Sequence, residues 1–257
     1  MARTATKTRQ VILISGASSG LGEGMARQYA ALGRDLALCA RRIERLQQLR
    51  DELTQLYPNI RVAIAPLDVN DHQQVFDVFQ SFKLEFGQLD RIIVNAGMGK
   101  GAALGKGHFA ANRQTAETNF VAALAQCEAA MNIFYEQGHG HLVTIASMSA
   151  LRGLPGAMTV YAASKAGLRA LSEGIRAELL KRPAPISVSC ILPGYIRSEI
   201  NENLPKTPFM VDNESGCRAL LKAIEKEPTE AYVPGWPWRL VGFLMKRLPL
   251  RWVLKLT

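Results

Sequence analysis

The sequence predicts a single doubly wound α/β domain, in which a parallel sheet of about seven strands carries helices on both faces. Three observations support this fold class. Short runs of apolar and β-branched residues alternate along the chain with longer segments of helical periodicity. These runs are apolar almost throughout, as expected for strands covered on both faces. A chain of 257 residues that is 48% hydrophobic can bury the core of one such domain.

The predicted strands read, in chain order, "VILIS", "DLALCA", "RVAIAP", "RIIVN", "HLVTIAS", "ISVSCILP" and a weaker "AYV", which are residues 11–15, 35–40, 61–66, 91–95, 141–147, 186–193 and 231–233. The helical segments between them are approximately residues 21–32, 43–56, 71–86, 112–136, 158–181 and 214–226. A helix between consecutive parallel strands implies right-handed crossovers. No repeat or linker divides the chain, so residues 1–257 are predicted to form one domain.

The formal net charge of +9 results from 31 basic and 22 acidic residues. All acidic residues lie between positions 11 and 230, whereas residues 1–10 and 231–257 contain eight of the basic ones. The body of the chain therefore has 23 basic and 22 acidic residues and is almost neutral. Because a protein that binds nucleic acid carries a basic patch on its folded body, we do not expect a nucleic-acid partner.

The cysteines and histidines form no recognisable metal or disulfide pattern. Four cysteines are widely spaced and contain no C-x-x-C motif: Cys39, Cys127, Cys190 and Cys217. This usage is typical of reduced thiols, so a cytoplasmic location is expected. His139 and His141 flank Gly140 without a third ligand in view, so no metal site is expected.

A glycine-rich turn follows the first predicted strand. The stretch "SGASSGLG" contains Gly16, Gly20 and Gly22 and leads into a helix. Backbone N–H groups and the positive helix end can hold a pyrophosphate in this context. The glycines would also suit a tight turn without a ligand. The end of the first strand is where doubly wound sheets bind ligands, and this favours a dinucleotide site.

Three further motifs follow in order. Asn95-Ala96-Gly97 ends the fourth predicted strand, Tyr161 and Lys165 share a predicted helix, and Pro193-Gly194 ends the sixth strand. With Ser15–Gly22, which matches T-G-x-x-x-G-x-G except for Ser in place of Thr, they resemble the short-chain dehydrogenase/reductase family. The resemblance covers nearly the whole chain and implies a Rossmann-type NADP(H)-dependent oxidoreductase that interconverts a carbonyl and an alcohol.

The resemblance also implies which residues form the site. The catalytic residues of the family correspond to Asn119, Ser147, Tyr161 and Lys165. In the family the lysine also binds the nicotinamide ribose, and the asparagine holds a water that links the lysine to solvent. The residues expected to bind the cofactor are Gly16, Ser18, Ser19, Gly20, Leu21, Gly22, Arg41, Arg42, Asp68, Val69, Asn95, Ala96, Gly97, Tyr161, Lys165, Pro193, Gly194, Ile196 and Ser198.

The chain departs from the family pattern at two places. Ser147 precedes Tyr161 by 14 positions, one more than is usual in the family, so Ser149 is an alternative for the catalytic serine. The strand "VTIAS" aligns with the family's strand end and selects Ser147. Ser198 stands where the family's P-G-x-x-x-T has threonine, a change that keeps the hydroxyl.

A tyrosine and a lysine four residues apart share one face of a helix. Such a pair is usually a half-buried anchor and a solvated charge. In the family context, however, Tyr161 is expected to exchange a proton with the substrate oxygen. Lys165, with a cationic oxidised nicotinamide, is expected to favour tyrosinate, and lowering the phenol pKa from about 10 to about 7 corresponds to roughly 4 kcal/mol. Ser147 is expected to donate a hydrogen bond to that oxygen.

The end of the second strand indicates the cofactor. NAD-binding relatives have an acidic residue there for the ribose hydroxyls, whereas this chain has Ala40, followed by Arg41 and Arg42. Arginine suits a 2′-phosphate by charge and geometry, although it is also common at the start of a solvated helix. We therefore expect NADP(H).

The substrate is expected to be an apolar ketone, aldehyde or alcohol. The loop region 195–215 and other strand ends place apolar residues near the expected site, as is typical of substrate-binding loops: Met98, Met148, Leu154, Tyr195, Phe209 and Met210. The resemblance further implies a homodimer or homotetramer formed through the helices at 112–136 and 158–181.

The C-terminal tail, residues 236–257, contains five basic residues, no acidic residue and all three tryptophans. Aromatic, leucine and basic residues together suit peripheral contact with a membrane surface. Pro249 interrupts any single helix, and the alternative is that the tail packs on protein. Two other classes of function remain open: a dinucleotide-binding regulator without turnover, and a membrane-surface protein on the same fold.

Overall fold

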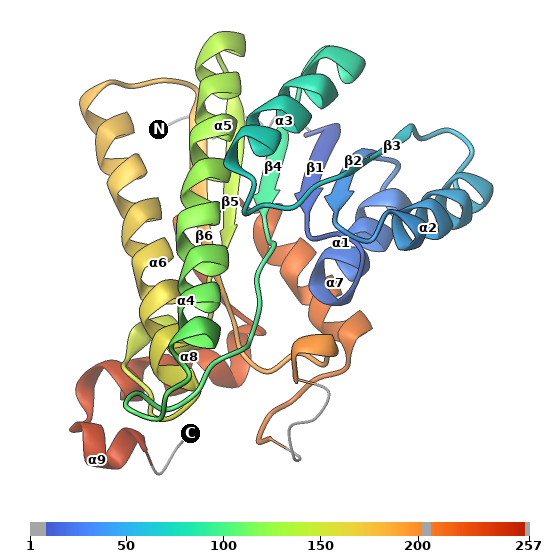
Figure 1. Ribbon diagram of the computed structural model, residues 1–257. Helices are drawn as coiled ribbons and strands as arrows, with labels where there is room; N and C mark the ends of the chain where they lie inside the picture. Colours follow the sequence, from blue (N-terminus) through green and yellow to red (C-terminus); the bar gives the residue numbers. More distant parts are fainter. Residues whose placement is uncertain (1–8, 202–206, 255–257) are drawn as a thin grey trace.

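The computed structural model describes residues 9–201 and 207–254, and these residues build a seven-stranded parallel sheet (Figure 1). The sheet order is β3-β2-β1-β4-β5-β6-β7. The order reverses between β1 and β4, which is the place where ligands bind in such sheets. The predicted Rossmann-type fold class is confirmed. The strands are β1 Val11–Ser15, β2 Asp35–Ala40, β3 Val62–Pro66, β4 Arg91–Val94, β5 Gly140–Ile145, β6 Ile186–Pro193 and β7 Glu230–Val233.

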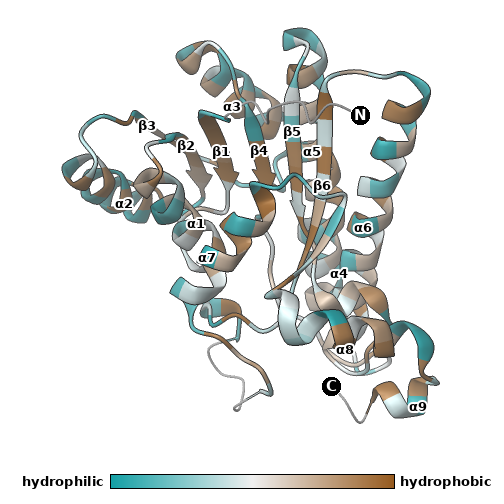
Figure 2. Ribbon diagram, turned by 180° about the vertical axis from the view of Figure 1, so that it is seen from behind, coloured by the Kyte–Doolittle hydropathy of each residue, from teal (hydrophilic) through white to brown (hydrophobic). Residues whose placement is uncertain are grey.

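Helices cover both faces of the sheet. Figure 1 shows one face behind α3 His72–Phe86, α5 Ala122–Gln137 and α6 Met158–Lys181, with α4 Phe109–Ala116 at the lower end of α5. The reverse view in Figure 2 shows α1, α2 and α7 on the other face. These are α1 Gly20–Ala31, α2 Ile43–Leu56 and α7 Asn213–Ile224.

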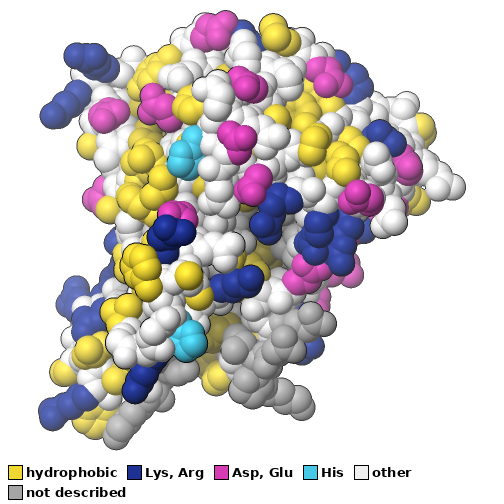
Figure 3. Space-filling model, viewed as in Figure 1, with side chains coloured by type: hydrophobic (Ala, Val, Ile, Leu, Met, Phe, Trp, Pro, Cys, Tyr) yellow, Lys and Arg dark blue, Asp and Glu magenta, His cyan; other side chains and the backbone are white. Residues whose placement is uncertain are grey.

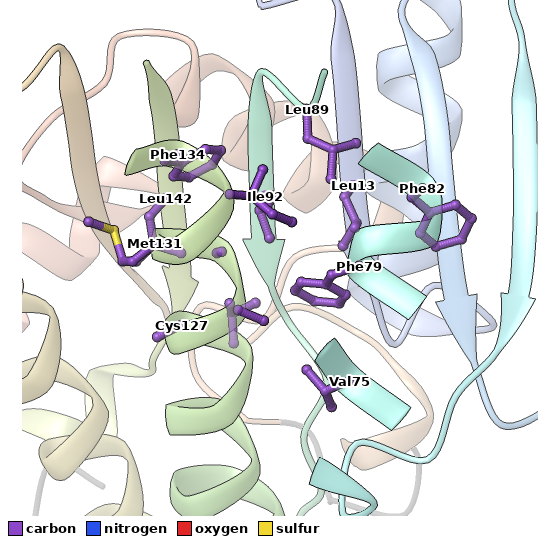
Figure 4. Packing of buried hydrophobic residues seen from close by; sticks show 14 of the residues in the cluster. Leu13, Val75, Phe79, Phe82, Leu89, Ile92, Cys127, Met131, Phe134 and Leu142 are labelled. Atoms are coloured by element: carbon purple, nitrogen blue, oxygen red, sulfur yellow. The ribbon is translucent and has the colours of Figure 1, made fainter. Parts of the chain in front are cut away.

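Each face of the sheet has its own apolar core. On one face, Leu13 and Ile92 of the strands pack with Phe79 of α3 and Phe134 of α5 (Figure 4). The alternate strand residues, including Ile12 and Ile14, face α1, α2 and α7. Because both sets are buried, the central parts of the strands are apolar on both faces, which is the pattern that the sequence shows.

Several helix boundaries match their local sequence. The predicted segments 43–56 and 158–181 are helical over those same residues. Asp71 caps α3 by accepting a hydrogen bond from the backbone N–H of Gln74 at 3.1 Å, and Gly87 ends that helix with a positive φ of 82°.

The predicted helix at 112–136 differs from the observed one. It begins three residues earlier, at Phe109, and contains a π-helical turn, Glu117–Val121, between α4 and α5. The predicted strand at 141–147 is also shifted, because β5 ends at Ile145 and Ser147 instead begins a 3₁₀ turn, Met148–Leu151.

Two helices in the C-terminal tail were not predicted. These are α8 Gly235–Arg247 and α9 Leu250–Val253, and Pro249 lies between them. Trp238 and Met245 of α8 pack in a third apolar cluster with Met148 and Leu192. The tail therefore packs on its own chain along one side. Residues 255–257 of the tail, 202–206 of the predicted substrate loop and Arg3 and Lys7 of the N-terminal segment lie outside the described residues.

A buried polar network lies at the amino ends of β4, β5 and β6. The Nε of Arg91 donates to His141 Nδ1 at 2.8 Å, and His141 Nε2 lies 2.9 Å from the Ser189 hydroxyl. Arg91 also pairs with Glu225 and, at 3.5 Å, with Glu227. Burial lowers the pKa of His141 well below its ordinary value, so the ring is neutral. The two ring nitrogens of His141 thus form hydrogen bonds with the neighbouring strands β4 and β6.

No helix in the described part of the chain has the length and apolarity needed to cross a membrane.

Candidate active site

The carboxyl ends of the parallel strands form the lower edge of the sheet in Figure 1, and the predicted site residues follow them. At the centre, Ser15 joins β1 to the loop after β4. Its hydroxyl accepts hydrogen bonds from the backbone N–H groups of Asn95 and Ala96, each at 3.1 Å. The Asn95 amide donates to the Ser15 carbonyl at 2.9 Å. These contacts fix the Asn95-Ala96-Gly97 segment beside the glycine turn.

The glycine turn requires glycine for steric reasons. Gly16 has a φ of +66°, and a Cβ there would lie 2.9 Å from the Ala96 Cα. A Cβ on Gly22 would lie 2.3 Å from the carbonyl oxygen of Gly16, which closes the turn tightly onto α1. Ser19 is the N-cap of α1, and its side chain makes no capping hydrogen bond. The first backbone N–H groups of α1 are therefore available to an anion, so these residues fit a dinucleotide pyrophosphate.

Lys165 lies under the site and is 5% exposed. Its ammonium donates a hydrogen bond to the Ile145 carbonyl at the end of β5, at 2.9 Å, and lies 6.0 Å from the centre of the Tyr161 ring. Burial lowers the pKa of Lys165 from 10.5 to about 8. The two side chains therefore share one face of α6, as the sequence predicts.

The Tyr161 phenol interacts with the side chain of Ser147. Burial raises the pKa of Tyr161, the interaction with Ser147 lowers it in part, and the nearby Tyr195 raises it again. In the protein alone, desolvation of the phenolate is the largest effect on this group. The predicted lowering of the Tyr161 pKa includes a cationic nicotinamide and stays a prediction.

The two candidate serines differ in their surroundings. Ser147 is the N-cap of the 3₁₀ turn, accepts from the Ser149 backbone N–H at 3.2 Å and reaches Tyr161. The Ser149 hydroxyl is buried without a hydrogen-bond partner among the described residues. Of the two serines, Ser147 is therefore the one that interacts with Tyr161.

Asn119 lies in the π-helical turn and is fully buried. Its side-chain oxygen accepts from the backbone N–H of Met98 at 2.8 Å, and its amide donates to the Met98 carbonyl at 2.9 Å. A Cβ on Gly97 would lie 3.1 Å from the Asn119 oxygen and 3.5 Å from the Lys165 ammonium, so these three residues converge. A π turn widens a helix locally and is frequent at functional sites.

The adenosine end of the predicted site lies around the ends of β2 and β3. Arg41 is exposed and makes no hydrogen bond or ion pair with the described residues. Arg42 donates to the hydroxyls of Ser19 at 2.6 Å and Ser18 at 3.3 Å. On the loop after β3, the Asp68 carboxylate accepts from the Asn70 backbone at 3.0 Å, and the neighbouring Val69 is buried.

At the other end, Pro193 is the last residue of β6, and the loop after it carries Gly194, Ile196 and Ser198. Ser198 approaches the glycine turn, since a Cβ on Gly20 would lie 3.3 Å from the Ser198 Cβ. Ile196 is buried, and Leu21, the remaining residue of the turn, packs against the same apolar core.

Three aromatic rings lie beside this loop. The Trp238 ring meets those of Tyr195 and Phe209 edge to face, with centroids 5.6 and 6.2 Å away. Of the other apolar candidates, Met148 is buried in the third core cluster, whereas Met98, Leu154 and Met210 are half-buried.

A sequence model described as "short chain dehydrogenase" matches residues 10–208, which is more than half of the chain. The chain belongs to the short-chain dehydrogenase/reductase family. An uncharacterized oxidoreductase of Mycobacterium tuberculosis is 56% identical over 244 residues, covering 95% of this chain and 96% of that protein.

Two solved structures of the family's fold are informative. An alcohol dehydrogenase of Thermococcus sibiricus complexed with 5-hydroxy-NADP has a TM-score of 0.75 at 25% identity, covering 87% of this chain and 95% of that chain. A short-chain dehydrogenase/reductase of Burkholderia phymatum in complex with NAD has a TM-score of 0.81 at 20% identity, covering 95% and 96%. This second likeness concerns the fold alone.

Sequence reasoning missed three contributors to the site. The Ile145 carbonyl receives the Lys165 hydrogen bond, Trp238 lies against Gly194, and Glu199 pairs with Arg42. A backbone carbonyl leaves no sequence signal, and the tail tryptophan and the loop glutamate lie 44 and 157 positions from their partners. Ser15 stood in the recognised motif, but its link to β4 became clear only in the structure.

Proposed function

We propose that this short-chain dehydrogenase/reductase is an NADP(H)-dependent oxidoreductase that interconverts a ketone or aldehyde with an alcohol. The observation that supports it best is the group formed by Tyr161, Ser147 and Lys165. A phenol that interacts with a serine and lies near a buried ammonium is suited to exchange a proton with a substrate oxygen.

Each residue has a distinct role in this proposal. When bound, the nicotinamide supplies or accepts the hydride at the substrate carbon. Tyr161 holds at its phenol oxygen the proton that passes to the substrate oxygen during reduction and returns during oxidation. Ser147 donates a hydrogen bond to the same oxygen as negative charge develops on it. Lys165 provides positive charge below the phenol and is held there by the Ile145 carbonyl.

The preference for NADP(H) over NAD(H) rests on the residues after β2. Ala40 provides no carboxylate for the ribose hydroxyls, and Arg41 is exposed without a partner among the described residues. Arg42 lies at the hydroxyls of Ser18 and Ser19 in the glycine turn, so two guanidinium groups are near the position of a 2′-phosphate. The similar Thermococcus structure contains an NADP derivative and the Burkholderia structure contains NAD. The proposed cofactor preference therefore rests on the residues of this chain.

The cofactor proposal is tested with Arg41→Ala. Loss of one charge-assisted contact with the phosphate should raise the KM for NADPH about tenfold or more and leave that for NADH almost unchanged. Equal use of NADPH and NADH by the unmodified protein would refute it. The assay is NADPH consumption with carbonyl compounds graded by size and polarity. The aromatic surface of Tyr195, Trp238 and Phe209 supports an apolar substrate.

We also propose a cytoplasmic homodimer or homotetramer. The four cysteines are free and buried, which supports a reducing compartment. The outer face of α4 and α5 exposes Phe109, Leu124 and Tyr135, which supports pairing through these helices. The molar mass by light scattering tests this, because Leu124→Glu should shift an oligomer towards monomer.

A peripheral membrane contact through α8 and α9 is a further proposal. These helices expose Trp236, Phe243 and Trp252, together with Arg239 and Arg251, and Lys and Arg gather with hydrophobic side chains at the lower left of Figure 3. Such a surface suits anionic headgroups. Co-sedimentation with anionic liposomes should weaken with salt and with Trp236→Ser. Absence of binding at low salt would contradict it.

A further inference from the structure

The loop after β6 is ion-paired to the helix that follows β2. Glu199 lies in a short 3₁₀ turn, Glu199–Asn201. Its carboxylate accepts from Arg42 Nη2 at 3.0 Å through one oxygen and from Arg45 through the other. The two parts of the chain are otherwise far apart in sequence, and no other described acidic residue pairs with either arginine.

Arg42 and Arg45 lie at the adenosine end of the cofactor site. Arg42 also contacts Ser18 and Ser19, so its guanidinium borders the glycine turn on the side of β2. A carboxylate and a phosphate present the same acceptor pattern to a guanidinium fork. Glu199 thus holds its negative charge where the 2′-phosphate of NADP(H) is expected. The hydrogen bond from Arg42, followed by that from Arg45, lowers the pKa of Glu199 to about 2, so this charge is present at every working pH.

The loop that carries Glu199 also carries Ser198, and hydrogen bonds within the loop hold these residues together. The Ser198 backbone N–H donates to the Asn201 side chain at 2.8 Å, and the Asn201 amide donates to the Ile196 carbonyl at 2.7 Å. Ser198 itself lies against the glycine turn. Glu199 and Ser198 therefore belong to one hydrogen-bonded loop segment beside the glycine turn.

We propose that Glu199 is a specificity-determining residue that competes with the 2′-phosphate of NADP(H) for Arg42 and Arg45. The phosphate displaces the carboxylate when it binds, and displacement releases the loop that carries Ser198. Glu199 thereby sets the affinity for the phosphorylated cofactor and couples binding of its 2′-phosphate to the loop that carries Ser198. The inference rests on the proposed NADP(H) preference.

The test compares the affinities of NADP⁺, 2′,5′-ADP and NAD⁺ by calorimetry in the unmodified protein, Glu199→Gln and Glu199→Ala. Removing the competing charge should tighten NADP⁺ and 2′,5′-ADP about three- to tenfold and change NAD⁺ less than twofold. Glu136→Gln is the control, since Glu136 pairs with Lys83 at the far end of α5 and loses the same charge. It should change no affinity.

Hydrogen–deuterium exchange provides a second readout without turnover. In the unmodified protein, 2′,5′-ADP should increase exchange in peptides covering residues 195–201, whereas 5′-ADP should not. In Glu199→Gln this exchange should already be high and should not respond. A brace that only orders the loop would instead weaken NADP⁺ and NAD⁺ alike when Glu199 is replaced, and this result, or unchanged affinities, would overturn the proposal.

The Arg41→Ala variant separates this inference from the proposed function. Arg41 makes no contact with Glu199 among the described residues, so its loss tests phosphate recognition alone. If Arg41→Ala weakens NADP⁺ but Glu199→Gln does not tighten it, only the competition is wrong. If the unmodified protein binds NADP⁺ and NAD⁺ equally and Arg41→Ala changes neither, the NADP(H) preference itself fails.

Discussion

Replacing Lys165 with methionine should stabilise the protein while removing its activity. Lys165 is 5% exposed, and burial lowers its pKa from 10.5 to about 8. Keeping the buried ammonium charged at pH 7 therefore lowers the free energy of unfolding by about 3 kcal/mol. Methionine has a similar length and carries no charge, but it leaves the Ile145 carbonyl without its 2.9 Å hydrogen bond, a loss of about 1 kcal/mol.

The net gain at pH 7 is about 2 kcal/mol, which for a protein of this size corresponds to an increase in Tm of about 4–8 °C. The gain should depend on pH in a defined direction. In the native protein Lys165 loses its proton near pH 8, whereas in the unfolded chain it does so near 10.5. Between these values the unfolded state binds more protons, so the unmodified protein gains stability as pH rises and the advantage of the variant disappears.

Thermal unfolding of the cofactor-free proteins from pH 6 to 10 measures this, with Lys222→Met as the control because Lys222 is exposed. The control should shift Tm by less than about 1 °C, as surface changes usually do. If the Tm of Lys165→Met at pH 7 is equal to or lower than that of the unmodified protein, then the buried charge of Lys165 does not destabilise the protein and the reasoning is wrong.

Two further predictions concern the serines and the tail. Ser147→Ala should lower kcat by about 10²-fold or more, because it removes a hydrogen bond to the developing charge. Ser149→Ala should have a much smaller effect in steady-state kinetics. A larger loss of kcat in Ser149→Ala would show that Ser149, and not Ser147, corresponds to the catalytic serine of the family. Gly194→Ala should destabilise the protein by about 1–3 kcal/mol, since its Cβ would lie 2.0 Å from the Trp238 ring. Its tryptophan emission should shift to the red, and unchanged emission and stability would contradict the contact.

The fold was predictable because most strands carry runs of consecutive apolar residues. Residues such as Leu13 and Ile14 face opposite cores, and a buried parallel sheet is the arrangement that needs both. The helices at 43–56 and 158–181 were equally clear from their periodicity. The π turn around Asn119 was not, and the two hydrogen bonds that the Asn119 side chain makes there go to Met98 in another loop, 21 positions away.

The candidate site was predictable where it is local in sequence. Tyr161 and Lys165 are one helical turn apart, and Gly16 and Gly22 occupy a single turn whose geometry demands glycine. The rise of the Tyr161 pKa in the protein alone left no signal in the sequence, since it depends on how deeply the phenol is buried.

The tail helices were missed because the apolar residues of α8 pack against a core that other segments form, and the tail sequence alone does not show this. Trp238 and Met245 face the cluster with Leu192, whereas Trp236 is 76% exposed. The sequence shows which residues are apolar, but not which of them meet Gly194 of a loop that lies 44 positions away.

The most direct test of the central claim is Tyr161→Phe, which keeps the ring and removes only the hydroxyl that interacts with Ser147. The measurement pairs kcat for NADPH-dependent carbonyl reduction with the Kd for NADPH by fluorescence titration. Tyr161 as proton donor predicts that kcat falls about 10²- to 10⁴-fold while the Kd changes less than about threefold. A variant that retains substantial kcat would contradict the assignment of Tyr161 as the residue that exchanges the proton with the substrate.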